Sequence, residues 1–297
     1  MKRAHAVAPG IAALALAVAP CVAAAQKDST AKKSPADTTQ RWSDFLPLMA
    51  DEAKKRGIEL PRPFGVGLVF YYLTRDIQVS DVSIGKNGAP PQSVSKFAQL
   101  GSRANVDNVN AKVDVWLLPF LNVYAIGGKI WNSSSTTIDV TLPPLLPGGM
   151  PRERVVTVPT SMQGTVLGLG LTAAGGYGPF FMTVDANWIS ADLGFDEALQ
   201  GTIVSIRGGW NGKLDTHAIR TWLVFTDWNT YATVTGTATD PDDGGTLQFV
   251  VDQGPAYRYT YGVGAQYSVT KWFDIATDMG ADFHGGWYVG LIPVVRF

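Results

Sequence analysis

Residues Gly286 to Phe297 read GWYVGLIPVVRF and form the last stretch of the sequence. Its apolar residues share one parity: Trp287, Val289, Leu291, Pro293, Val295 and Phe297. The other parity is mixed and includes Arg296. Because successive side chains of a strand point to opposite faces, this stretch predicts a β-strand with one wholly apolar face.

The aromatic last residue adds a second feature to this strand. Alternating apolar positions that end on Phe297 resemble the closing strand of bacterial outer-membrane β-barrel proteins. The resemblance implies that Val295 and Phe297 belong to a signal read by the barrel assembly machinery and that the strand closes a barrel. Pro293 departs from the pattern, because proline cannot donate a ladder hydrogen bond. A soluble β protein that ends in Phe is the alternative.

The first 25 residues have the parts of a secretory signal peptide. Lys2 and Arg3 give a positive start, Ile11–Ala19 is apolar, and Ala23–Ala25 supplies small residues for cleavage. Cys21 is the only cysteine and lies within this segment. We therefore expect neither a disulfide nor a thiol site in the mature chain.

Two short segments are expected before the barrel. Residues 26–41 lack aromatic and large aliphatic side chains, which predicts a disordered periplasmic leader. Residues 42–62 are expected to form a short periplasmic helix, opened by Leu46-Pro47, and a linker. The helix either packs under the periplasmic mouth, as its short length favours, or reaches into the lumen as a plug.

Composition agrees with a transmembrane barrel. The chain has 32 Gly, 9 Trp, 10 Tyr and 13 Phe among 297 residues, and its hydropathy is near neutral. Strands with an apolar lipid face and a polar lumen face average to such a value. The formal net charge of −1 becomes about −3 without Lys2 and Arg3. This charge gives no electrostatic reason to expect nucleic acid as a partner.

Two-faced strands recur through the predicted barrel domain, residues 63–297. In the clearest of these strands, one face carries Asn110, Lys112, Asp114 and Trp116, and the other face carries the apolar residues Ala111, Val113, Val115 and Leu117. Tight turns alternate with long polar segments, as in outer-membrane barrels. Asn211-Gly212 predicts a type I′ hairpin turn. We expect an all-β fold, a closed antiparallel transmembrane β-barrel of about ten strands.

Three long segments are assigned to the external side. Ser80–Asn108 is polar and predicts an outer loop with some strand extension; a full membrane hairpin there would raise the count to twelve strands. Asn132–Ser161 carries a Pro/Gly cluster and predicts a second long loop. Tyr231–Phe249 has a strand-like Thr/Val pattern and predicts a β-ribbon that projects beyond the bilayer.

The polar parity of the strands predicts the charges of the lumen. The expected cations are Lys112, Lys129, Arg207, Arg220, Arg258 and Arg296, and the expected anions are Asp114, Asp185, Asp274, Asp278 and Asp282. These signs nearly cancel, whereas an ion-selective pathway usually carries one sign. The set favours cross-strand pairs that stiffen a narrow interior. A narrow pore for small polar or amphipathic solutes is the alternative.

Asp282 and His284 are the candidate catalytic residues. They lie two positions apart near the outer rim, as an Asp-His pair that activates water requires, and so resemble one half of the omptin protease site. The facing Asp-x-Asp pair of that site has no match. A His-rich metal site is excluded, because only His217 and His284 remain after processing. No cofactor is expected.

Together these features predict an integral outer-membrane protein of a Gram-negative-type bacterium, without catalytic activity. It would act as a narrow pore for small solutes or as a structural barrel. A surface binding or adhesion protein with a plugged lumen is one alternative, and a rim-site hydrolase is a second. The expected partners are outer-membrane lipid, lipopolysaccharide and the barrel assembly machinery; the sequence does not identify the solute.

Overall fold

The structure is a computed structural model that describes residues 45–55, 60, 62–93, 98–142, 152–194, 198–239 and 244–297. The predicted signal peptide (1–25) and leader (26–41) lie outside these residues. Within them, helix α2 (Ala50–Lys55) precedes strands β1 (Phe64–Lys86), β2 (Gln92–Ser93), β3 (Ala98–Leu118), β4 (Leu121–Leu142), β5 (Arg152–Tyr177), β6 (Phe180–Asp192), β7 (Leu199–Leu214), β8 (His217–Thr239), β9 (Thr246–Pro255), β10 (Tyr259–Ser268), β11 (Phe273–Ala281) and β12 (Trp287–Arg296).

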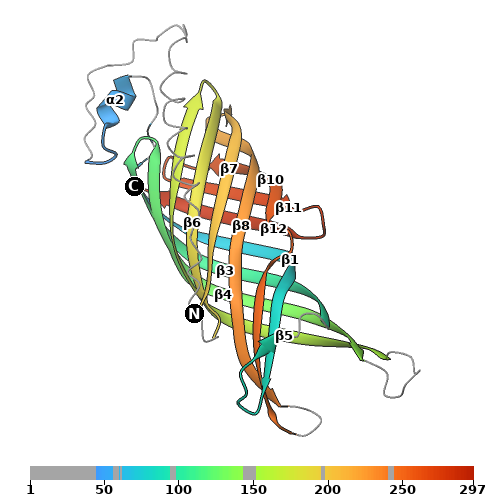
Figure 1. Cartoon of the computed structure of the whole chain (residues 1–297). Coiled ribbons are helices and arrows are strands. Elements are labelled where there is room, and N and C mark those ends of the chain that lie inside the picture. The colour runs from blue at the N-terminus through green and yellow to red at the C-terminus, as the bar shows by residue number, and fades with distance from the viewer. Residues whose placement is uncertain are drawn as a thin grey trace.

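Ten of these strands form a closed antiparallel ring. Neighbours run in the order β10, β11, β12, β1, β3, β4, β5, β6, β7 and β8, and β8 pairs again with β10. Closure leaves no free sheet edge in the ring, so backbone groups that water cannot reach are paired. The predicted all-β closed barrel is confirmed, with β2 and β9 added to the ten-stranded ring (Figure 1).

Strand β9 completes the wall at the loop end of the barrel. It pairs with β8 over Ala232–Thr239 and with β1 over Ile77–Lys86. The pairing of β1 with β12 ends at Thr74. Beyond that point β10, β11 and β12 no longer separate β8 from β1, and β9 fills the gap between these two strands. The predicted ribbon is therefore present, but it joins the wall instead of projecting alone.

The external segments contain more strand than the sequence predicted. Strands β4 and β5 stay paired from Asn132↔Met162 to Leu142↔Arg152, so the loop assigned to Asn132–Ser161 was wrong over most of its length. Thr, Val and Ile recur there and favour an extended backbone. Most of the segment Ser80–Asn108 is also strand, in β1, β2 and β3, so the outer loop predicted there was wrong over most of its length; its described residues form no additional membrane hairpin.

One predicted turn was also wrong. Asn211 and Gly212 lie inside β7, and the chain turns after Leu214↔His217 pairing, where Asp215 has a φ of 53°. Gly212 serves packing instead, because a Cβ there would collide with the ring of Trp210.

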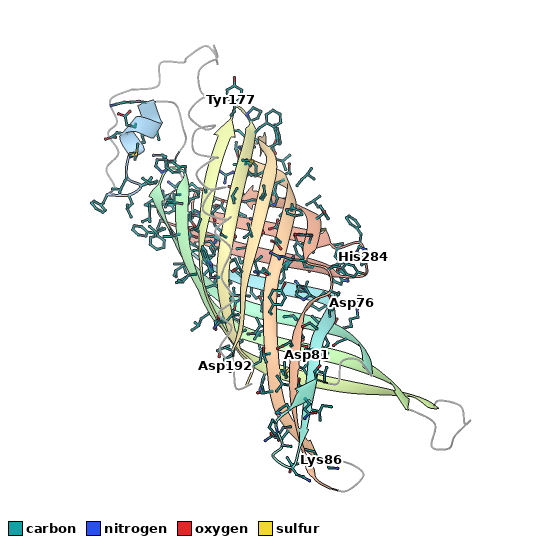
Figure 2. The ribbon with its side chains drawn as sticks, in the orientation of Figure 1. Asp76, Asp81, Lys86, Tyr177, Asp192 and His284 are labelled. Atoms are coloured by element: carbon teal, nitrogen blue, oxygen red, sulfur yellow. The ribbon has the colours of Figure 1, made fainter. Side chains whose placement is uncertain are left out.

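The outer face of the ring is apolar (Figure 2). Large apolar side chains on it include Leu68, Phe70, Val113, Leu167, Leu169, Leu223, Val263 and Leu291. Val113 is 53% exposed and Leu223 is 71% exposed, as lipid-facing residues of a barrel should be. Soluble monomers rarely expose contiguous apolar patches of this kind to water. No helix in the described part of the chain is long and apolar enough to span a membrane.

Strand β12 closes the ring against β1 at the end of the sequence. The backbone of Phe297 exchanges two hydrogen bonds of 3.0 and 3.1 Å with Phe64, and the two rings stack at 6.1 Å. Residue pairing between these strands stops at Gly67↔Val294 and resumes at Phe70↔Leu291. Pro293 lies in this gap, which is where a missing backbone donor is expected to interrupt the ladder.

Helix α2 lies at the turn end of the barrel (Figure 1). The Leu48 N–H donates to the Leu117 carbonyl at 2.9 Å, which ties the segment to the end of β3. Met49 and Glu52 reach the mouth of the lumen, whereas strands line the bore. This placement agrees with packing at the mouth; residues 42–44 and 56–59 of the predicted helix and linker lie outside the described residues.

Candidate functional site

A cavity of about 2220 Å³ lies within the ring of strands. Its lining begins at Met49 and Arg62 at the turn end and reaches Leu193 and Gln253 at the loop end. Every strand of the ring contributes inward side chains between these ends. The lumen is therefore a continuous internal space and is the candidate functional site.

The width of this lumen follows from the strand pairing. One row of paired residues runs from Gly176 of β5 through Phe181, Gly209, Trp222, Gly264, Asp278, Gly290, Tyr71, Asn108 and Ile130 to Gly164 of β5. A path that follows paired residues once around the barrel therefore leaves β5 at position 176 and returns to it at position 164, a stagger of 12 residues. For ten strands this stagger gives a tilt of about 40° and a backbone radius of about 10 Å. Since packed sheets lie about 10 Å apart, side chains take about 5 Å from each wall and leave a bore about 10 Å wide.

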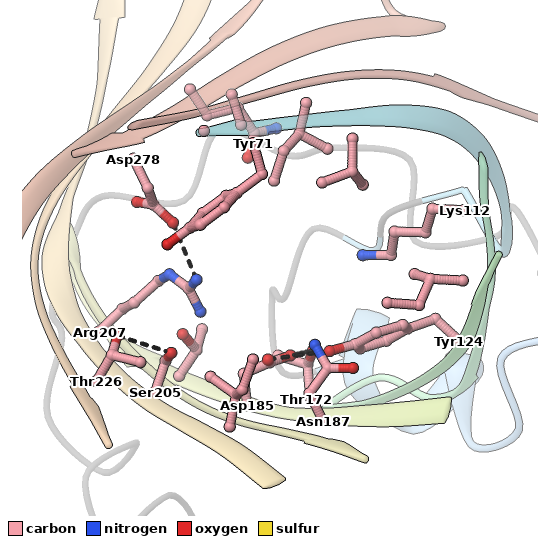
Figure 3. A pocket seen from close by; sticks show the side chains of 18 of the residues that line it. Tyr71, Lys112, Tyr124, Thr172, Asp185, Asn187, Ser205, Arg207, Thr226 and Asp278 are labelled. Atoms are coloured by element: carbon pink, nitrogen blue, oxygen red, sulfur yellow. Dashed lines mark hydrogen bonds and ion pairs between the residues drawn. The ribbon is translucent and has the colours of Figure 1, made fainter. Parts of the chain in front are cut away.

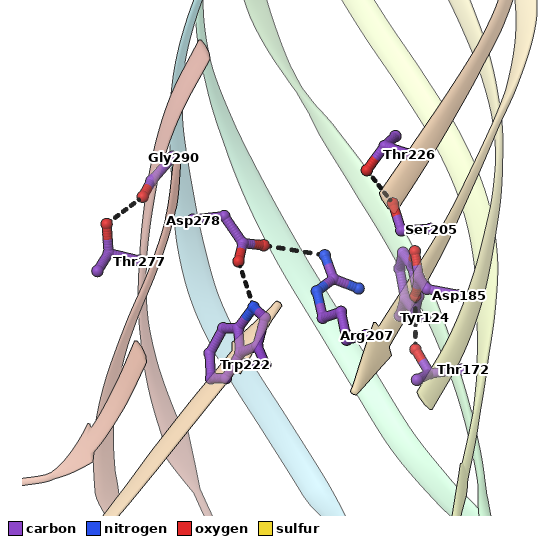
Figure 4. Close-up of polar contacts among 10 residues, drawn as sticks. All are labelled: Tyr124, Thr172, Asp185, Ser205, Arg207, Trp222, Thr226, Thr277, Asp278 and Gly290. Atoms are coloured by element: carbon purple, nitrogen blue, oxygen red, sulfur yellow. Dashed lines mark hydrogen bonds and ion pairs between the residues drawn. The ribbon is translucent and has the colours of Figure 1, made fainter. Parts of the chain in front are cut away.

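A charged belt surrounds the middle of this bore (Figure 3). On one wall, the Arg207 guanidinium donates to Asp278 at 2.9 Å, and the Trp222 indole N–H donates to the other oxygen of Asp278 at 2.6 Å (Figure 4). Nearby, the hydroxyls of Ser205 and Thr226 share a hydrogen bond of 2.9 Å. These bonds hold polar side chains from β7, β8 and β11 in fixed positions.

The opposite wall of the belt has a different arrangement. Asp185 accepts hydrogen bonds from the Tyr124 hydroxyl at 3.0 Å and from the Thr172 hydroxyl at 2.6 Å (Figure 4). The Lys112 ammonium lies 4.2 Å from the centre of the Tyr124 ring. Lys112 makes no ion pair among the described residues, so its charge faces the lumen (Figure 3).

A buried polar cluster joins the belt to the closing strand. Asp114 accepts hydrogen bonds from Asn122 at 2.9 Å and from Arg296 at 3.0 Å, and its side chain is only 1% exposed. Asp114 and Arg296 pair across β1 at Gly65, where a Cβ would lie 2.5 Å from an Asp114 oxygen. Glycine is needed at position 65 because it leaves room for this ion pair. Asp274 lies 3.9 Å from Arg296 and completes the cluster.

Toward the loop end, the lumen changes to an aromatic layer. Trp228, Tyr288 and Leu73 are buried, and Tyr71 packs against them together with Val106 and Ile203. The ring centres of Tyr71 and Tyr288 lie 5.5 Å apart, and each ring lies 5.9 Å from that of Trp228. The alternation of polar and apolar residues did not predict this layer, because apolar side chains were expected on the lipid face.

Seven of the predicted lumen charges line the cavity: Lys112, Asp185, Arg207, Arg220, Asp274, Asp278 and Arg296. Asp114 lies behind them, paired with Arg296. The prediction that Lys129 faces the lumen was wrong. Lys129 is exposed and pairs with outward-facing Val109, while Ile126 and Ile130 of the same strand line the cavity. The inner and outer faces of β4 were interchanged, because apolar side chains also occupy the lumen.

The prediction that Arg258 faces the lumen was also wrong. It does not line the cavity, but pairs with Asp227, to which its Nη2 donates at 2.7 Å. Asp227 shares the parity of Leu223 and Phe225 on β8, and Leu223 is lipid-facing. The pair therefore lies on the outer side of the wall, near the loop-end rim.

Asp282 and His284 lie in the loop between β11 and β12, and Figure 2 shows His284 at the rim. Asp282 is buried and does not line the cavity. Its carboxylate accepts the backbone N–H of His284 at 2.7 Å and that of Gly286 at 2.9 Å, so it organises the loop. The His284 Nδ1 lies 2.8 Å from the Asp282 backbone carbonyl, and its ring stacks on Tyr257. Thus the His284 imidazole meets the backbone carbonyl of Asp282 and not its carboxylate, whose Oδ1 holds the loop.

No group of three or more His, Cys, Asp and Glu side chains that could hold a metal ion occurs among the residues that the structure describes.

No protein-family model matches the sequence, and no curated protein matches it. Similar solved structures include the outer-membrane protein OprG of Pseudomonas aeruginosa, with 10% identity, a TM-score of 0.37, and coverage of 80% of this chain and 100% of that chain. The toluene transporter TbuX of Ralstonia pickettii has 12% identity, a TM-score of 0.34, and coverage of 80% and 90%. The β domain of the Bordetella autotransporter BrkA has 10% identity, a TM-score of 0.34, and coverage of 80% and 100%.

Scores this low say nothing about a solute or an activity of this chain. The chain's own closed ring and apolar outer face carry the conclusion on fold. As predicted from its last strand, the chain is an outer-membrane β-barrel protein.

Proposed function

We propose that this barrel is a water-filled pore that passes small solutes across the outer membrane. The observation that supports the proposal is the continuous cavity, which is lined from the turn-end mouth to the loop end. Barrels of eight strands have interiors just filled by side chains, whereas the ten-stranded ring here leaves a bore about 10 Å wide. A bore of this width admits small solutes and excludes folded proteins.

The charges of the belt suggest weak ion selectivity. Arg207 is neutralised by Asp278, and Arg296 by Asp114 and Asp274. Paired charges hold the wall in shape without presenting a ring of one sign to a passing ion. Lys112 has no ion pair among the described residues, and it adds a small preference for anions. The pore thus suits neutral and amphipathic solutes as well as ions.

Conductance of the purified protein in planar bilayers tests the proposal. We expect discrete steps, and we expect Asn187→Trp to lower them, because Asn187 lines the bore. Leu223→Trp is the matched control, since it places the same side chain on the lipid face and should leave conductance unchanged. A silent membrane with correctly folded protein would overturn the pore and favour a structural or surface-binding barrel.

The proposal includes no catalytic step. The His284 Nδ1 lies against the backbone carbonyl of Asp282 and not against its carboxylate, an arrangement that does not favour a rim-site hydrolase. Outer-membrane lipid and lipopolysaccharide would contact the apolar outer face. The assembly machinery would act on β12, where Val295 is exposed and Phe297 completes the seam with Phe64.

A further inference from the structure

Arg75 is a buried cation that has no ion-pair partner among the residues that the structure describes. It lies on β1, lines the cavity and is only 6% exposed. Among the described residues, its guanidinium makes neither a hydrogen bond nor an ion pair within 4.0 Å. Asp282 acts on it only from beyond ion-pair distance, and Oδ1 of that carboxylate accepts two backbone N–H groups of its own loop. Arg75 therefore differs from Arg207 and Arg296, which both have carboxylate partners.

An unpaired buried charge is costly, so its presence calls for a partner. Buried ionic groups in proteins are normally paired or hydrogen-bonded, because water no longer solvates them. Asp278 and Asp114 fill this role for the belt arginines. No carboxylate of the described residues lies within 4.0 Å of Arg75, and the cavity is the open side from which a partner can arrive.

The position of the guanidinium suits a carboxylate. It lies over the Trp228 ring, with its central carbon 4.6 Å from the ring centre. The indole is fixed, since its N–H donates to the Thr260 hydroxyl at 2.9 Å. The Arg75 N–H groups donate to no hydrogen-bond acceptor among the described residues, and a guanidinium edge matches the two oxygens of a carboxylate. Opposite Arg75 in the sheet stands Ala104, which takes up little space.

The surroundings of Arg75 suit an apolar body attached to that carboxylate. Tyr71, Leu73 and Arg75 share the inward face of β1, and four residues of strand span about 13 Å. The aromatic layer of Trp228 and Tyr288 lies along this distance. The Tyr71 hydroxyl is buried and has no hydrogen-bond partner, so it offers a second polar contact.

We propose that Arg75 and the aromatic layer form a binding subsite for small amphipathic carboxylates within the pore. The guanidinium holds the carboxylate, while Tyr71, Trp228 and Tyr288 hold an aromatic or short aliphatic body. The subsite rests on the proposed pore, because the solute reaches it through the bore. It gives the pore a preferred class of solute.

Calorimetry on the full-length mature protein in neutral-detergent micelles tests the subsite without requiring conductance. The probes are 3-phenylpropionate and its uncharged amide, each corrected for partition into empty micelles. We expect the acid to bind at least tenfold more tightly than the amide. Arg75→Met should remove this preference, a loss of about 1.4 kcal/mol in acid binding, while leaving the amide unchanged. Arg75→Lys should keep part of it.

Arg220→Met is the matched control, because Arg220 also lines the cavity but lies outside the aromatic layer. It should bind both probes like the unaltered protein. Equal binding of acid and amide, no binding of either, or full acid binding by folded Arg75→Met would overturn the subsite. If Arg75→Met does not fold, the acid and amide comparison on the unaltered protein decides.

Conductance separates the two proposals. In planar bilayers, 3-phenylpropionate should reduce the current of the unaltered pore, and the Arg75→Met pore should be less sensitive. A conducting pore without acid binding overturns the subsite alone, whereas acid binding by a protein that does not conduct overturns the pore alone.

Discussion

Asp114→Ala should destabilise the barrel at its closing seam. The Asp114 side chain is 1% exposed and accepts hydrogen bonds from Arg296 of β12 and Asn122 of β4. It thereby connects β3 to β12 across the intervening strand β1, over Gly65. Alanine removes both bonds and leaves Arg296 with only Asp274, at 3.9 Å.

The expected loss can be worked out from these contacts. Removing one partner of a buried ion pair costs about 3–5 kcal/mol, because the other charge stays buried. Arg296 is 20% exposed and keeps a distant carboxylate, so we take the lower end, about 3 kcal/mol. Asp114→Asn keeps a hydrogen-bond acceptor and should lose about half as much.

Urea unfolding in lipid vesicles measures this loss. For slopes of about 1–3 kcal/mol/M, the midpoint should fall by about 1–3 M. The control is Asp227→Ala, which breaks the ion pair with Arg258 on the outer side of the wall. The Arg258 side chain is 40% exposed and the Asp227 side chain is 25% exposed. Exposed pairs contribute less than about 1 kcal/mol. An unchanged midpoint for Asp114→Ala, or an equal shift for Asp227→Ala, would refute the assigned role of the seam cluster.

Further predictions concern the belt, the hairpin and the closing strand. Lys112→Glu replaces the unpaired belt cation, so the reversal potential in a KCl gradient should shift toward cation preference; an unchanged potential would contradict the assignment. Gly212→Val should lower the urea midpoint of unfolding, because a side chain at position 212 would collide with the Trp210 ring. Gly208→Val is the control, since position 208 lies on the same face with open space around it and should leave the midpoint unchanged. Equal effects of the two substitutions would count against this packing. Deleting Phe297 removes two backbone hydrogen bonds and a ring contact, so the yield of folded, heat-modifiable barrel should drop; an unaffected yield would argue against an assembly signal there.

The fold was predictable from the sequence because lipid imposes a strict rule on strands. Each strand must turn an apolar row outward, and residues such as Val113 and Leu223 follow this rule. The last strand, which closes the ring against β1, and the tight turn at Pro119-Phe120 also met the expectation. The strand extensions were harder to predict, since paired strands outside the bilayer need no apolar row and resemble loops in composition.

The lumen was less predictable, because its side chains obey no single rule. Polarity correctly suggested Asp185 and Asp278, but it misplaced Lys129 and missed the inward Ile126 and Ile130. Polarity also gave no sign of the aromatic layer.

Arg75 could not be singled out from the sequence. Its significance is the missing partner, which depends on side chains from strands far apart in the chain. Asp282 resembled half of a catalytic pair because the sequence shows only its spacing to His284. The same spacing suits a carboxylate that accepts hydrogen bonds from the backbone of its own loop, which is what the structure shows.

The central claim is that alternate residues of each strand face lipid and a water-filled bore. Cysteine labelling of two neighbouring residues tests it most directly, since the only native cysteine, Cys21, lies in the predicted signal peptide. In reconstituted vesicles, a water-soluble maleimide should modify the Lys112→Cys variant through the bore and spare Val113→Cys, which faces lipid. Equal labelling of both, or labelling of Val113→Cys alone, would contradict the barrel described above.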